Sequence, residues 1–72
     1  MSKPVQIEDG EWYYKGCFIQ KQTHPSLMKY HIFKDTKSQA TISFCGAFLQ
    51  AIAICNKYEV KNPIHTAEDF LN

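Results

Sequence analysis

Arginine is absent from this sequence of 72 residues, and its eight cations are all lysines, set against seven acidic residues. The guanidinium group is the usual bidentate partner of guanine edges and phosphates, whereas lysine offers only a point charge. The formal net charge is +1 with histidine neutral, and no block of like charges occurs along the chain. These absences argue against a protein that reads DNA sequence or binds a polyanion by bulk charge.

Glycine and cysteine are both scarce, with three residues of each. The glycines, at positions 10, 16 and 46, are too far apart to form a phosphate-binding loop. Three cysteines are an odd number without C-x-x-C spacing, which is not the pattern of a secreted disulfide-bonded domain. We therefore expect a protein of the reducing cytoplasm.

Long hydrophobic runs are missing as well, so we expect no membrane span, and residues 1–10 do not have the apolar core of a secretory signal. Hydrophobic residues nevertheless make up 44% of the chain and aromatic residues 14%, which is typical of a globular domain. The length predicts one domain, 1–72, and a chain of this size buries only about 60% of its unfolded surface. Its parts are an N-terminal arm or edge strand (1–10), a sheet (11–45), a helix (46–60) and a C-terminal segment (61–72).

The N-terminal half has the residues of strands. Stretches of β-formers flank Asp9 and Gly10, a pair that favours two-residue hairpin turns, although Pro4 leaves open whether residues 5–8 are a strand. Residues 11–20 give the strongest strand signal, and Gly16 inside them predicts a bulge or a close packing contact. Continuous alternation places three side chains toward the helix: Trp12, Tyr14 and Phe18. It places four on the opposite side: Tyr13, Lys15, Cys17 and Ile19.

Two further strands are expected, at residues 28–34 and 40–45. The connection before the first of them contains Pro25, whose preceding residue is pushed out of helical angles. Polar residues at 35–39 form the turn between the two strands. Alternation in the last strand predicts that Ile42 and Phe44 are buried and that Thr41 and Ser43 are solvated.

Residues 47–58 are expected to form a helix, since apolar residues recur there at three- and four-residue spacing. One face holds Phe48, Ala51, Ile52 and Cys55. The other side is apolar too, at Leu49, Ala53 and Ile54, so it needs a cover. Thr66 and Asp69 form a capping pattern for a last turn at residues 67–71. We expect either this turn, through Phe70 and Leu71, or a second molecule to cover the helix.

The predicted fold is α+β: a three- or four-stranded antiparallel sheet packed on one main C-terminal helix, with a short final helical turn. Six side chains in it are potential zinc ligands: Cys17, Cys45, Cys55, His24, His31 and His65. No two cysteines are closer than ten positions, however, and structural zinc sites pair ligands two to four residues apart. Cys45 begins the helix as a potential thiolate nucleophile, but no motif brings a histidine to it. We expect no metal, no cofactor and no catalysis.

The predicted open face of the sheet carries the candidate binding residues Tyr13, Lys15, Lys29, His31, Phe33, Thr41 and Ser43. Aromatic rings with interleaved lysines on a sheet bind single-stranded nucleic acids, but these cations are few for a phosphate track. Aromatic residues also dominate protein interfaces. We favour a non-catalytic protein-binding module, adaptor- or inhibitor-like, with nucleic-acid binding as the alternative. A homodimer through Leu49, Ala53 and Ile54 is left open, and no membrane partner is expected.

Overall fold

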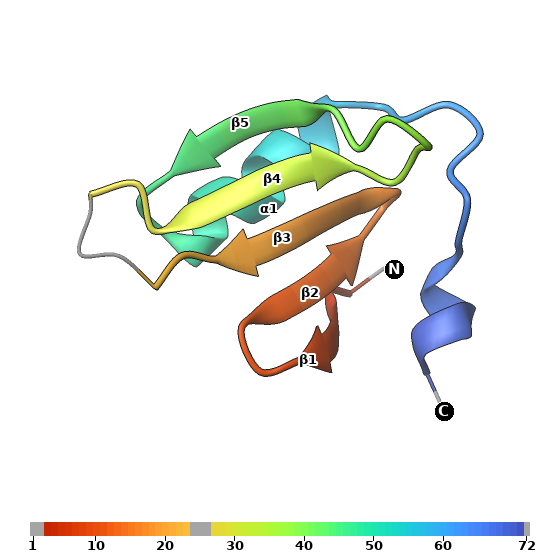
Figure 1. The fold of residues 1–72 in the computed structure, drawn as a ribbon, viewed down its shortest axis with the longest axis horizontal. Helices are drawn as coiled ribbons and strands as arrows, with labels where there is room; N and C mark the ends of the chain where they lie inside the picture. Colours follow the sequence, from red (N-terminus) through yellow and green to blue (C-terminus); the bar gives the residue numbers. More distant parts are fainter. Residues whose placement is uncertain (1–2, 24–26, 72) are drawn as a thin grey trace.

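The computed structural model describes residues 3–23 and 27–71, which form one antiparallel sheet, one α-helix and one 3₁₀ turn (Figure 1). The strands follow one another in space in chain order, each antiparallel to its neighbour. Their bounds are β1 Val5–Glu8, β2 Glu11–Tyr14, β3 Cys17–Lys21, β4 Tyr30–Lys34 and β5 Thr41–Cys45. The helix α1 spans Phe48–Lys57 and lies behind the sheet, and the 3₁₀ turn η1 spans Ala67–Phe70. The α+β class is confirmed, with five strands where three or four were predicted.

The extra strands come from two tight hairpin turns. Asp9 and Gly10 join β1 to β2, so residues 5–8 are a strand. Lys15 and Gly16 join β2 to β3, with φ angles of 49° and 79°. Gly16 therefore lies in a hairpin turn, and the bulge predicted there is wrong. The alternative prediction, close packing, is confirmed, because a Cβ at Gly16 would lie 3.1 Å from that of Val60 and 3.3 Å from that of Pro63. Two consecutive residues with positive φ form the turn whose twist matches that of the flanking strands.

This turn reverses the chain and restarts the alternation of faces. Cys17 and Ile19 are buried toward α1, and Phe18 lies on the opposite face. The prediction for these three residues is wrong, because it carried one alternation through positions 15 and 16. Trp12 and Tyr14 do face the helix, as predicted.

The hydrophobic core lies between the sheet and α1. It is built from small and medium side chains of both layers: Tyr14, Cys17, Ile19, Ile32, Cys45, Ala51 and Cys55. Partly buried rings close its edge, with the centroids of Trp12 and Phe48 4.8 Å apart. The helix thus buries one apolar stripe, as its spacing predicts, and ends where the Tyr58 backbone N–H donates to the Ile54 carbonyl.

The C-terminal segment, residues 58–71, crosses to the face of the sheet opposite α1. Its turn η1 packs against β1, and the Phe70 ring lies 5.0 Å from that of Tyr13. The predicted turn is present, and the Thr66 backbone N–H donates to the Asp69 carboxylate at 2.9 Å. The expectation that Phe70 covers the helix is wrong, because the segment packs on the sheet instead.

Candidate functional site

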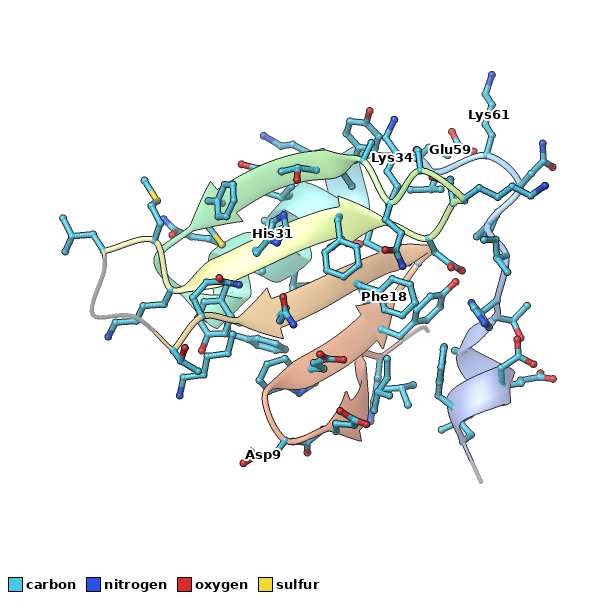
Figure 2. All side chains as sticks on the ribbon, in the orientation of Figure 1. Asp9, Phe18, His31, Lys34, Glu59 and Lys61 are labelled. Carbon is cyan, nitrogen blue, oxygen red and sulfur yellow. The ribbon has the colours of Figure 1, made fainter. Side chains whose placement is uncertain are left out.

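A row of stacked rings crosses the sheet on the face opposite α1, which we call the open face. The four side chains of this aromatic row are Phe44, His31, Phe33 and Phe18. His31 stacks on Phe44 with centroids 4.5 Å apart and planes inclined by 8°, and Phe18 stacks on Phe33 at 5.3 Å. Both contacts join residues that are direct neighbours across paired strands. Figure 2 shows His31 and Phe18 on the side of the sheet turned away from the helix.

His31 is held in place by a hydrogen bond as well as by stacking. Its Nε2 lies 2.8 Å from Oγ1 of Thr41, on the neighbouring strand β5. A hydroxyl can donate or accept, so this contact accommodates either tautomer of the ring. His31, Phe33 and Thr41 were predicted on the open face, and all three lie there.

Phe44 was predicted to be buried against the helix, and this prediction is wrong. The strand β5 contains a register shift: Ile32 pairs with Ser43 and Phe33 pairs with Thr41, so Ile42 is an extra residue. Such a bulge changes the alternation of faces along the strand. Phe44 is therefore 48% exposed on the open face, whereas Ser43 lies on the helix face beside Ile32. Ile42 packs against the core, as predicted.

The remaining candidate residues do not join the aromatic row. Tyr13 lies on this face but is only 2% exposed, because the C-terminal segment covers it. Lys15 sits in the hairpin turn with its Nζ 5.5 Å from the ring of Tyr14, on the helix side. Lys29 is exposed and precedes β4. The open face therefore has fewer lysines than the sequence predicted.

Asp35 anchors the covering segment. The Tyr13 hydroxyl donates to Asp35 Oδ2 at 2.9 Å, the His65 backbone N–H donates to the same oxygen at 2.6 Å, and His65 Nδ1 lies 3.0 Å from Oδ1. A carboxylate only accepts, so Nδ1 carries the proton. Burial raises the pKa of Tyr13, and the neighbouring Asp35 raises it further. This network was not predicted from the sequence, because Asp35 and His65 are 30 positions apart and an acidic residue in a polar turn is usually solvated.

An Asp–His pair can orient a general base in an enzyme. Here Asp35 instead fixes backbone groups of separate elements by hydrogen bonds. The same Asp35 contributes its own N–H to Gly16 and its carbonyl to Ile64, so both of its backbone groups tie elements together. The buried carboxylate is the fixed end of the C-terminal segment. No serine, threonine, cysteine or lysine side chain is among its hydrogen-bond partners in the part of the chain that the structure describes.

The three cysteines are buried free thiols. Cys45 donates its thiol hydrogen to the Ala47 carbonyl at 3.4 Å. Cys17 and Cys55 contact each other across the core, and the Cys55 thiol holds the pKa of Cys17 below its usual value. His31 and His65 are bonded to Thr41 and Asp35 instead, and His24 lies outside the described residues. Over residues 3–23 and 27–71, no group of three or more His, Cys, Asp or Glu side chains is placed to hold a metal ion.

An apolar groove borders β5 on the helix side. This β5 groove has a volume of about 380 Å³ and is lined by Met28, Phe44, Cys45, Gln50, Ala53 and Ile54, among others. Of the residues predicted for self-association, Ala53 and Ile54 line it, and Leu49 is 81% exposed on the same helix. The C-terminal segment reaches the other face, so this side of α1 is not covered by η1.

No protein-family model, curated protein or solved structure matches this chain. Within the described residues, no helix has both the length and the apolar character needed to cross a membrane. The open face and the edge of β5 are therefore the surfaces from which a function has to be argued.

Proposed function

We propose that this protein is a non-catalytic protein-binding module that acts as a homodimer, joined through the free edge of β5. The position of Phe44 carries the proposal. Its ring is half exposed, it ends the aromatic row, and it stands on a strand that has a neighbour on one side only.

The two edge strands of the sheet, β1 and β5, differ in how well they are protected from pairing with another strand. An edge strand presents unpaired backbone N–H and C=O groups, which proteins usually protect with charges, proline or a covering segment. Pro4 precedes β1, Glu8 lies in it, and η1 packs against it. In contrast, β5 reads Thr-Ile-Ser-Phe-Cys and holds neither a charge nor a proline. Strand addition is therefore favoured at β5.

Apolar side chains flank β5 on both faces of the sheet. Phe44 lies on the open face, and Ala53 and Ile54 lie in the β5 groove on the helix face. No charged side chain lines this groove. A segment that binds here has to be extended, uncharged and apolar at alternate positions. The strand β5 itself meets this description, which is why we propose a second copy of the chain as the occupant.

The faces of β5 limit the registers that are possible for self-pairing. A two-fold axis perpendicular to the sheet keeps both helices on one side, and residues directly opposite in an antiparallel pair share a face. Ser43 and Cys45 are on the helix face and Phe44 is on the open face. The register that pairs Phe44 with Phe44 of the second copy, and Ser43 with Cys45, meets this condition, and it is the one we propose. This register joins the two aromatic rows end to end.

A stable dimer needs only a modest part of the surface that the chain exposes. A stable interface takes roughly 800 Å² from each partner, which is about 15% of the 5250 Å² that the chain exposes. The contributors lie together around the end of β5 and the start of α1. They include three exposed apolar side chains: Leu27 at 89%, Leu49 at 81% and Phe44 at 48%.

The oligomeric state tests the proposal. We expect sedimentation equilibrium to give a dimer for the wild-type chain and a monomer for Phe44→Lys, because like charges then face each other at the centre of the pairing. Leu71→Lys is the matched control, since Leu71 is 63% exposed and follows η1, which packs against β1 at the other edge of the sheet. A wild-type chain that stays monomeric at about 1 mM contradicts the proposal. So does a dimer that Phe44→Lys leaves intact.

Nucleic-acid binding is the second candidate, and the stacked rings of the aromatic row favour it, because bases stack on such rings. The scarcity of lysines on the open face disfavours it. Fluorescence anisotropy of labelled single-stranded oligonucleotides distinguishes the two. Binding at low salt that His31→Ala weakens supports this candidate, and no binding at low salt rejects it.

We also propose a reducing compartment for the protein. Its three cysteines are all buried free thiols, and the Cys17 thiol donates to the Lys15 carbonyl at 3.9 Å. A reducing environment keeps such cysteines as thiols.

A further inference from the structure

A cavity of about 480 Å³ lies beside the C-terminal end of α1, and three lysines line it. Lys34 comes from β4, Lys57 from the last turn of α1 and Lys61 from the segment that follows. We call this site the lysine cavity; the Thr36 and Tyr58 side chains also border it. Figure 2 shows Lys34, Glu59 and Lys61 gathered at this end of the molecule, far from Asp9.

The lysines of this cavity have little compensating charge. Glu59 is the one acidic residue in its lining, so three cations face one anion. Within the described part of the chain, the only ion pair joins His65 to Asp35, and no carboxylate is within 4.0 Å of these ammonium groups. Lys34 instead lies over the Tyr58 ring, with Nζ 4.9 Å from the ring centroid. A neighbouring cavity of about 290 Å³ shares Lys57 and adds Lys15.

The position of one of these lysines, Lys57, is explained by the C-terminal end of α1. Partial negative charge at a helix C-terminus favours a cation in the last turn, where Lys57 lies. Lys34 and Lys61 come from a strand and a connecting segment, so the helix dipole does not account for them. Like charges that converge from separate elements repel each other, and a bound anion offsets that repulsion.

We infer that the lysine cavity binds a small ligand with two or more linked phosphate groups. Lysine is a compact point charge that pairs with any phosphate oxygen, and the three lysines of this cavity match the multiple negative charges of linked phosphates. The Thr36 hydroxyl adds a donor at the rim. The volume is in the range of small-ligand sites. This inference is independent of the proposed dimer, since its residues lie outside β5 and the β5 groove.

Calorimetric titration of the full chain with tripolyphosphate at low ionic strength tests the inference. We expect saturable binding of one ligand per chain. Lys34→Gln and Lys61→Gln are each expected to weaken it about tenfold, the effect of losing one hydrogen bond to a charged group. Glu59→Gln is expected to tighten binding, because it removes the one carboxylate that faces the ligand. Adenosine triphosphate, titrated in the same way, separates a nucleotide from a free phosphate chain.

The matched control is Lys21→Gln, which changes the net charge equally at the opposite end of β3. If Lys21→Gln weakens binding as much as Lys34→Gln does, the interaction is bulk electrostatics and the inference is wrong. It is also wrong if tripolyphosphate shows no saturable binding up to about 1 mM. Thermal melting of each variant shows whether a loss of binding comes from a loss of folding.

Discussion

Asp35 connects more separate parts of the chain than its position in a short turn suggests. Its carboxylate accepts from Tyr13 of β2 and from His65 of the C-terminal segment, and its side chain is 2% exposed. Buried charge is costly unless it is fully hydrogen-bonded. Three donors converge on two carboxylate oxygens, so the burial is compensated.

Asp35→Asn is therefore expected to lower the free energy of unfolding by about 2 kcal/mol. The asparagine side chain has only one acceptor oxygen. Its NH₂ group takes the place of the second oxygen, so a donor then faces one of the donors that the carboxylate had accepted from. Asp9→Asn removes the same charge in the exposed turn between β1 and β2 and is expected to change stability by less than about 0.5 kcal/mol. Urea denaturation measures both. Equal effects from the two variants would show that the Asp35 network adds nothing to stability.

The buried Tyr13 hydroxyl is expected to make the stability of the fold depend on pH in the alkaline range. Its pKa is raised by burial and by Asp35, so the folded state retains the phenolic proton to higher pH than the unfolded state does. The unfolded chain loses that proton from about pH 10, so stability is full below pH 10 and falls above it, by up to about 1.4 kcal/mol per pH unit. Tyr13→Phe is expected to be less stable at pH 7 but to show a flatter decline above pH 10 in urea denaturation. Parallel declines for the two proteins would contradict this.

The elements depend on two hairpin turns with different surroundings. Gly10 and Gly16 both have positive φ, at 82° and 79°. A methyl group added at Gly10 meets only the Lys21 Cβ at 3.7 Å, an ordinary contact, whereas at Gly16 it meets the Cβ atoms of Val60 at 3.1 Å and Pro63 at 3.3 Å. The second turn is thus also a packing site for the C-terminal segment.

Gly16→Ala is expected to destabilise the fold more than Gly10→Ala does. Both variants carry the backbone cost of about 1–2 kcal/mol for a left-handed alanine, and only Gly16→Ala adds the displacement of Val60 and Pro63. Urea denaturation of the two variants separates the backbone cost, which both share, from the cost of displacing Val60 and Pro63. A smaller effect at position 16 would mean that the C-terminal segment yields easily there.

At the scale of the whole molecule, two consecutive segments of the chain cover the two faces of the sheet. The helix α1 covers one face, and the C-terminal segment covers the end of the other around Tyr13 and Phe18 (Figure 1). Phe70 contacts both of those rings, at 5.0 and 6.2 Å. The part of the open face that stays exposed is therefore set by where this segment ends.

Phe70→Ala is expected to lower the free energy of unfolding by about 2 kcal/mol, because a half-buried aromatic side chain leaves the face of Tyr13. Leu71→Ala, next to it and 63% exposed, is expected to cost less than about 0.5 kcal/mol. Hydrogen exchange of β1 and β2 amides provides a second readout, with faster exchange expected in Phe70→Ala alone. Unchanged exchange in that variant would show that η1 does not stabilise these strands.

The sequence by itself determined most of the elements, although not the division of residues 11–20 into β2 and β3. The Asp9–Gly10 turn, the alternation in residues 40–45, the apolar spacing of the helix and the Thr66–Asp69 cap are all local patterns, and local patterns act through backbone geometry within a few residues. The apolar helix side was visible in the sequence for the same reason.

The tertiary structure decided which face each side chain occupies and which distant residues meet. The turn at Lys15–Gly16 and the extra residue in β5 each shifted the alternation by one position, which moved Phe18 and Phe44 to the open face. Packing of separate elements brings Asp35 into hydrogen-bonding distance of His65, and it places Lys34, Lys57 and Lys61 around one cavity. Residues far apart in sequence have no periodic relation to one another, so the cover of Tyr13 and the lysine cavity required the folded chain.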